Sequence, residues 1–261
     1  MKRATFLAHV TEAARQQNIL EEQMLSTVRE WGFEALEVHS DMLCPDTIRR
    51  LKAADLAISC VYRLCDYNRP EEQDAIRRFL YDVAEAGSRQ VLILPEDMTP
   101  GDRTPQIARL AEHLHRTCEE AAPYGIRVLL EDYDGAGSPC CQLADLRTLL
   151  EAVPALGLAF DTGNFLYSGQ DTLEAYARLK GRLCHLHLKD RCLTPLHPND
   201  QPMVTPDGRA LYPCAAGKGI LPIATILQKA QEQGYDGYAV TEHFGAADQY
   251  TCLQEDAKLK L

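Results

Sequence analysis

The sequence lacks the features that mark membrane and secreted proteins. No apolar run approaches the roughly 20 residues that span a bilayer. The basic start MKRATFLAHV has too short an apolar stretch for a signal peptide, and no cleavage-site pattern follows it. The ten cysteines are scattered and form no CxxC pair, which favours reduced core thiols over disulfides or a cysteine metal cluster. We therefore expect a cytoplasmic protein with no membrane partner.

Positive charge is also scarce. Lys and Arg number 27 against 38 Asp and Glu, which gives a formal net charge of −11. Because contacts from Lys and Arg to phosphate dominate nucleic-acid binding, this balance argues against a nucleic-acid partner. The sequence also has no GxGxxG after an apolar strand and no GxxxxGK[ST], so it lacks the two common nucleotide-binding fingerprints.

The sequence does contain a regular alternation of apolar β-rich runs and amphipathic helical runs. Eight such pairs occur in 261 residues without a clear linker in the first 190, and this number is typical of a single-domain (β/α)8 TIM barrel over residues 1–261. A doubly wound open sheet is the alternative. The expected strands are 4–10, 35–40, 57–64, 90–96, 126–134, 156–164, 182–190 and 237–244. The expected helices are 20–32, 44–55, 70–87, 104–125, 142–153, 171–181 and 221–235, with a short closing helix in 247–261.

Charged groups follow the apolar runs in the second half of the chain. Glu131, Asp161, His187 and Glu242 each stand at the end of an expected strand. The C-terminal ends of barrel strands carry the catalytic residues of this fold, so these four should converge. Three carboxylates and one neutral imidazole suit one divalent ion, namely Mn²⁺, Mg²⁺, Co²⁺ or Zn²⁺. Each residue alone is more often a helix cap, a rim ion pair or a core histidine, but four at strand ends favour a site.

The strand in GRLCHLHLKDR, residues 181–191, has an unusual polar face. Its period of two places His185, His187, Lys189 and Arg191 on one side, opposite an apolar side. We expect His187 to be a metal ligand, Lys189 and Arg191 to face the substrate, and His185 to lie one layer deeper. Strand ends in the first half offer Glu37 and Arg63 as further substrate contacts, against the alternative of rim salt bridges.

The ordered segments VLLED, FDTGN, HLKD and VTEHF, with AAGKGIL before the last helix, resemble the xylose isomerase-like TIM barrels of the sugar phosphate isomerase/epimerase family. The resemblance implies that Glu131, Asp161, His187 and Glu242 bind one divalent metal. It implies that Glu131 and Glu242 also form the acid/base pair. Asn164 stands where several members have a substrate-binding histidine, so we expect it to contact the substrate.

The implied activity is a metal-dependent isomerase or epimerase of a sugar or sugar phosphate. It would transfer a proton α to a carbonyl through an enediolate. A dehydratase of a keto-polyol, of the inosose type, is the alternative, because the same site could expel a β-hydroxyl. An abasic-site endonuclease is a weaker one, since it needs several more histidines. A non-enzymatic sugar-binding barrel would not need two glutamates at one metal.

The segment 191–219 is rich in Pro, Asp and Gly and unusually long for a loop in a compact domain. We expect it to cover the site or to contact another subunit, which leaves a homo-oligomer open.

Overall fold

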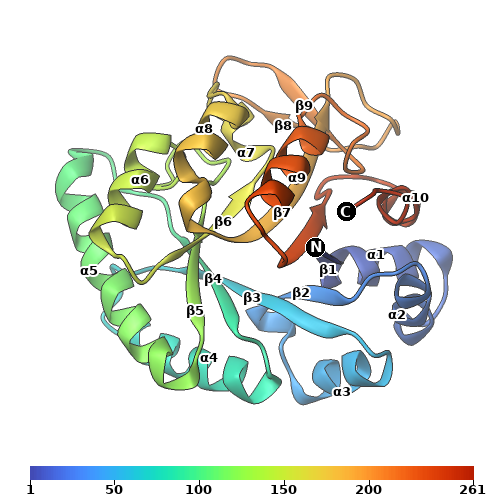
Figure 1. Cartoon of the computed structure of the whole chain (residues 1–261), viewed down its shortest axis with the longest axis horizontal. Helices are drawn as coiled ribbons and strands as arrows, with labels where there is room; N and C mark the ends of the chain where they lie inside the picture. The colour runs from blue at the N-terminus through green and yellow to red at the C-terminus, as the bar shows by residue number, and fades with distance from the viewer.

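The structure is a computed structural model and describes residues 1–261. Eight parallel strands close into a barrel, because the last of them pairs with both the first and the seventh (Figure 1). The predicted TIM barrel is therefore confirmed. The order around the barrel is β10 (Tyr238–Glu242), β1 (Lys2–Phe6), β2 (Ala35–His39), β3 (Ala57–Cys65), β4 (Gln90–Pro95), β5 (Arg127–Glu131), β6 (Gly157–Asp161) and β7 (Leu183–Cys192).

Helices connect successive strands and form the outer layer (Figure 1). None of them combines the length and hydrophobicity that crossing a bilayer requires. The helices are α1 (Leu7–Gln17), α2 (Glu21–Glu30), α3 (Pro45–Ala53), α4 (Glu72–Ala86), α5 (Arg103–Ala121), α6 (Leu143–Ala152), α7 (Asn164–Tyr167), α8 (Thr172–Leu179), α9 (Ile223–Glu232) and α10 (Gln249–Asp256), with short 3₁₀ turns η1 (Ser40–Met42), η2 (Ala122–Tyr124) and η3 (Lys180–Arg182).

Helix α4 illustrates how local sequence sets these elements. Acidic residues occupy its first turn, where they complement the helix dipole, and Gly87 ends it in a left-handed conformation with φ of 84°. Ile76, Leu80 and Val83 recur with the helical period and are fully buried. They belong to the large apolar cluster between the barrel and its outer helices, so this face anchors α4 to the sheet.

The first expected strand, 4–10, is wrong in its second half. Strand β1 ends at Phe6, and α1 begins at Leu7. Leu7, Val10, Ala13 and Ala14 are buried with helical spacing, and this period overrides the short β-like run. A helix before α2 was therefore missed.

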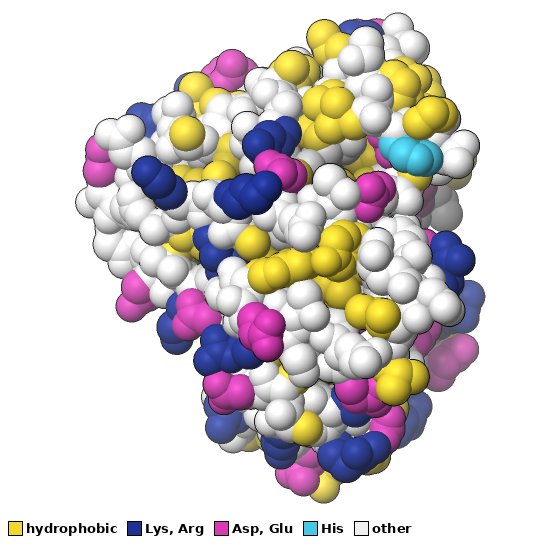
Figure 2. All heavy atoms as spheres, turned by 90° about the vertical axis from the view of Figure 1, so that its right-hand side faces the viewer, with side chains coloured by type: hydrophobic (Ala, Val, Ile, Leu, Met, Phe, Trp, Pro, Cys, Tyr) yellow, Lys and Arg dark blue, Asp and Glu magenta, His cyan; other side chains and the backbone are white.

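The long segment after β7 is not a simple loop. The last residues of β7 leave the barrel and pair antiparallel with β9 (Ala210–Cys214), which pairs in turn with β8 (Met203–Val204). Figure 2 shows this segment at the top of one face, where hydrophobic side chains gather. The large apolar side chains that it exposes are Leu193, Leu196 and Val204.

Candidate metal centre and cavity

The four residues expected to bind a metal come together at the C-terminal end of the barrel. Glu131 ends β5, Asp161 ends β6, His187 lies in β7 and Glu242 ends β10. One candidate ligand atom from each lies within 4.8 Å of the others, and all four residues are buried. Strand register explains why these residues lie close together. His187 of β7 is paired with Asp161 of β6 and with Val240 of β10, two residues before Glu242.

His187 lies at the centre of this group. Its Nδ1 is 2.5 Å from Glu131 Oε1 and 3.5 Å from Glu242 Oε2. Burial by itself lowers the pKa of His187, but the carboxylates of Glu37 and Glu131 raise it well above its ordinary value. The two carboxylates thus favour the protonated form of the ring.

Asp161 has one oxygen that the protein does not satisfy. Its Oδ1 accepts hydrogen bonds from the backbone N–H of Gly163 at 2.7 Å and of Asn164 at 2.8 Å. Its Oδ2 is buried with no hydrogen-bond partner, and burial raises the pKa of Asp161 well above its ordinary value. Buried polar atoms are normally satisfied. An unpartnered carboxylate oxygen beside two further carboxylates and an imidazole therefore fits a divalent cation.

Lys189 lies on the rim of the cluster. Its Nζ is 2.7 Å from Glu242 Oε1 and 3.7 Å from Asp161 Oδ2, and it donates a hydrogen bond to Asn164 Oδ1 at 2.7 Å. Burial by itself lowers the pKa of Lys189, but Asp134, Asp161 and Glu242 raise it well above its ordinary value. The ammonium group is thus charged and held among carboxylates.

Arg191 is buried beside Lys189, and its guanidinium has one polar partner, Asp134. Its Nη2 lies 3.4 Å from Asp134 Oδ2, which also lies 3.5 Å from Lys189 Nζ. Arg191 and Lys189 both line the cavity described below. Both contacts to Asp134 are long, so the guanidinium can form shorter hydrogen bonds with a bound molecule.

Asn164 and Glu37 were expected to contact the substrate, but neither lines the cavity. Asn164 is buried away from the cavity lining, where its Nδ2 donates to the Asp132 carbonyl at 2.6 Å while its Oδ1 holds Lys189. Glu37 is fully buried beneath the cluster, bonded to His185 and His187. Both therefore support other site residues and do not line the cavity.

Arg63 points out of the barrel, so the expectation that it faces the substrate is corrected. Its Nη2 forms an ion pair with Glu72 Oε1 at 2.6 Å, and its guanidinium lies over the Phe79 ring, both in α4. Neighbouring residues of a strand face opposite sides, and Tyr62 is the one that lines the cavity. Cys60, two residues earlier in the strand, packs inside the barrel, in agreement with the inward position of Tyr62.

A cavity of about 370 Å³ opens above the cluster. One side presents Glu131, His187 and Glu242, and residues 201–203, at the start of β8, cover part of it. Three residues of the segment that was expected to cover the site thus line this cavity. The cavity residues that sequence reasoning missed are largely aromatic or apolar and resemble ordinary core positions; they are Phe6, Tyr62, Leu92, Leu94, Tyr133, Asp134, Met203 and Phe244.

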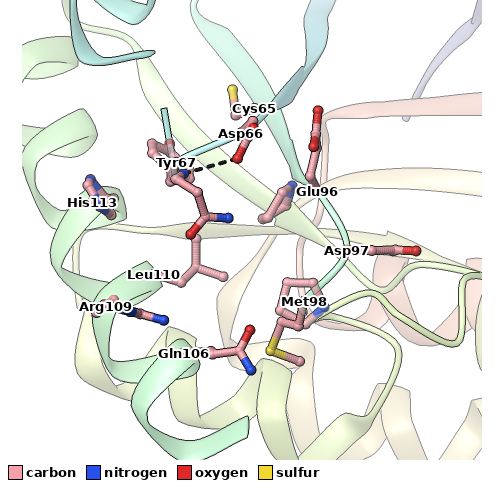
Figure 3. A pocket seen from close by; sticks show the side chains of 13 residues that line it. Cys65, Asp66, Tyr67, Glu96, Asp97, Met98, Gln106, Arg109, Leu110 and His113 are labelled. Atoms are coloured by element: carbon pink, nitrogen blue, oxygen red, sulfur yellow. Dashed lines mark hydrogen bonds between the residues drawn. The ribbon is translucent and has the colours of Figure 1, made fainter. Parts of the chain in front are cut away.

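A second cavity, of about 250 Å³, lies between the ends of β3 and β4 and helix α5 (Figure 3). Tyr67 and His113 stack on one wall with ring centroids 5.0 Å apart, and Glu96 and Asp97 directly follow β4. None of the four clustered residues lines it. Three of them, Glu131, His187 and Glu242, line the first cavity.

Comparison with known proteins places this arrangement in a family. An inosose dehydratase of Lacticaseibacillus casei is 26% identical over 137 residues, which is 51% of this chain and 46% of that protein. The chain thus spans about half the length of the curated relatives it matches.

Solved structures show the same fold. The probable 3-DHS dehydratase AsbF involved in petrobactin synthesis from Bacillus anthracis has a TM-score of 0.77 at 20% identity, covering 99% of this chain and 98% of that one. The IOLI protein, in a structure with a zinc atom, has a TM-score of 0.73 at 14% identity over 99% and 94%. The model of the xylose isomerase-like TIM barrel family matches residues 25–259, so the chain belongs to that family.

Proposed function

We propose that the protein is a divalent-metal-dependent sugar or sugar phosphate isomerase or epimerase, which moves a proton at the carbon α to a carbonyl. The observation that carries the proposal is the pair of buried glutamates, Glu131 and Glu242, that flank His187 Nδ1 at 2.5 and 3.5 Å. Their strands, β5 and β10, are separated by β6 and β7, so the two carboxylates approach the cavity from different directions.

The residues that would hold the metal are Glu131, Asp161, His187 and Glu242. When bound, a divalent ion supplies Lewis-acid stabilisation of the negative charge that develops on the carbonyl oxygen. The unpartnered Oδ2 of Asp161 supports this assignment.

The protein's own residues would handle the proton. One glutamate removes it from the carbon α to the carbonyl, and the other returns one to the opposite face or to the neighbouring carbon. Burial raises the pKa of Glu131 above that of a free glutamate, which makes it a stronger base once ionised. Lys189 holds Glu242 through its 2.7 Å ion pair, and Arg191 would bind a substrate oxygen. Residues 201–203 help to exclude water.

A dehydratase is the second candidate, because the matching curated relatives are named inosose dehydratase. The first step would be the same proton removal. The β-hydroxyl would then leave as water, taking a proton from an acid in the site. The ammonium of Lys189 is a candidate acid, since it lines the same cavity. An abasic-site endonuclease is less well supported, because the cluster contains a single histidine.

A deuterium-exchange assay tests the proposal. Metal-free protein is reloaded with Mn²⁺ and incubated in D₂O with a panel of keto-sugars, their phosphates and inososes. An isomeric product that carries solvent deuterium at the reprotonated carbon supports the isomerase or epimerase. An unsaturated product, whose α carbon has lost its hydrogen, supports the dehydratase. An isomeric product formed without solvent deuterium in any case would contradict proton transfer and favour a hydride shift.

A further inference from the structure

Two buried polar residues lie beneath the candidate metal centre and take no part in the proton transfer proposed above. Glu37 and His185 both have side chains with 0% exposure. Glu37 Oε2 is 2.7 Å from His185 Nε2 and 3.0 Å from His187 Nε2. Neither residue lines the cavity, so neither can touch a substrate there.

The chemistry of this contact determines which nitrogen of His187 faces the cavity. Glu37 Oε2 lies within hydrogen-bond distance of a ring nitrogen of both His185 and His187. One carboxylate oxygen can accept from both N–H groups at once, whereas a carboxylic acid O–H could donate to only one ring. The Nε2 of His187 must carry a proton and donate it to Glu37. Only Nδ1, which faces Glu131 and Glu242, is then free to bind a cation.

We propose that Glu37, itself held by His185, is a positioning residue that fixes the ring orientation and tautomer of His187, so that Nδ1 is presented to the metal. The inference rests on the proposed function, because it concerns the same metal centre. Carboxylates that accept a hydrogen bond from the second nitrogen of a ligating histidine orient the ring and raise its basicity.

A purely structural role would explain this arrangement less well. Burying a carboxylate is costly unless partners compensate it, and an apolar residue would fill the same space in the barrel. Cys60 lies beside Glu37 and His185 in the same buried layer, but its thiol donates a hydrogen bond to the backbone carbonyl of Val61 and to neither of these side chains. It therefore offers a control for general damage to packing.

The test measures binding of Mn²⁺ alone to the purified metal-free protein by calorimetry, without substrate. Glu37→Gln keeps the size of the side chain but removes the charge, so His187 can adopt the other tautomer. We expect the dissociation constant to rise about 10- to 100-fold. Cys60→Ala should bind Mn²⁺ as tightly as the wild type. With Co²⁺, the visible absorption band should shift in Glu37→Gln and stay unchanged in Cys60→Ala.

A second pair of variants tests the role of His185 and guards against misfolding of Glu37→Gln. His185→Gln retains an N–H donor for Glu37, whereas His185→Leu does not. We expect His185→Leu to weaken Mn²⁺ binding by less than about tenfold and His185→Gln to restore most of the loss.

The outcomes separate this inference from the proposed function. Wild-type affinity in Glu37→Gln, or equal losses in Glu37→Gln and Cys60→Ala, would overturn the positioning role and leave the metal-dependent function standing. A wild-type protein that binds no Mn²⁺ would overturn both.

Discussion

The two halves of the barrel contribute different things to the cavity. Strands β1, β3 and β4 supply an apolar and aromatic wall, namely Phe6, Tyr62, Leu92 and Leu94. Strands β5, β7 and β10 supply charged and imidazole groups, namely Glu131, His187, Lys189, Arg191 and Glu242. Closure makes β5, β6, β7 and β10 four consecutive neighbours. The candidate ligand atoms lie within 4.8 Å of one another, a separation that side chains on neighbouring strands can reach. The charged and imidazole groups of the cavity therefore lie in one half of the barrel.

The largest effect is expected from the two glutamates of the charged half. Glu131→Gln and Glu242→Gln should each lower kcat by about 10²-fold or more, because the amide cannot accept the substrate proton. The matched control is Glu96→Gln. Glu96 follows β4 as Glu131 ends β5, but it lines the second cavity. Turnover assays on the responsive substrate decide the matter. Near-normal rates in both Glu131→Gln and Glu242→Gln, or an equal loss in Glu96→Gln, would contradict the proposed role of the two glutamates.

The next effect concerns His187 and pH. The pKa of His187 in the metal-free protein is raised well above its ordinary value by Glu37 and Glu131. A metal at Nδ1 must displace that proton, so apparent affinity should rise with pH, about tenfold per unit, until the raised pKa is passed. His187→Ala should lose at least about 10-fold in affinity and lose this part of the pH dependence. Calorimetric titration of Mn²⁺ from pH 6 upward measures both. If the affinity of the wild-type protein for Mn²⁺ did not depend on pH, the metal would not bind at His187 Nδ1.

A smaller effect is expected where the charged half contacts the substrate. Arg191→Gln should raise KM about tenfold, which is the loss of about 1.4 kcal/mol of binding, and should change kcat little. The reason is that its guanidinium has only the long 3.4 Å contact to Asp134. Steady-state kinetics separate the two constants. A fall in kcat with KM unchanged would place Arg191 in the chemical step.

The smallest effect is expected at Arg63, in the other half. Arg63→Gln breaks the ion pair with Glu72, whose side chain is 10% exposed, so the free energy of unfolding should fall by about 1 kcal/mol. Kinetic constants should stay at wild-type values, because the side chain points away from the cavity. Urea unfolding and steady-state assays test the two statements together. A raised KM in Arg63→Gln would indicate that Arg63 contacts the substrate after all.

The sequence predicted the arrangement of the charged half well, because the rule for it is simple. A polar residue after an apolar strand marks the C-terminal end of that strand, and Glu131, Asp161 and Glu242 follow this rule. His187 lies inside the longer β7, where it is paired with Asp161 of β6 and Val240 of β10. Their convergence then depends only on barrel closure. The metal-binding and catalytic roles of these residues stay predictions.

The other half was harder to predict. Phe6 and Tyr62 line the cavity, but an apolar residue at a strand end looks like any core residue. Arg63 was chosen for its charge, although strand alternation from Cys60 places it outside. Glu37 was recognised as a polar strand end, but no sequence pattern says that it lies beneath His187. Contacts between distant strands, such as this one, require the three-dimensional structure.

The ribbon β8–β9 leaves the barrel and returns to it at the same point. The backbone N–H of Ile220 donates to the Arg191 carbonyl at 2.9 Å. Gly219 packs so closely there that a Cβ would lie 2.3 Å from that same oxygen. Asp190 secures the junction by accepting hydrogen bonds from the N–H groups of Gly217, Gly219 and Leu221.

Because of this junction, segment 192–218 can be replaced as a whole by the corresponding segment of a related protein. A segment whose ends meet can be replaced by one of another length without moving the strands that carry it. Its inner end, at residues 201–203, touches the cavity, while its turn at Gly208 is exposed. If the proposed function holds, grafting this segment from relatives between Arg191 and Gly219 should change substrate preference and leave the candidate metal centre unaltered.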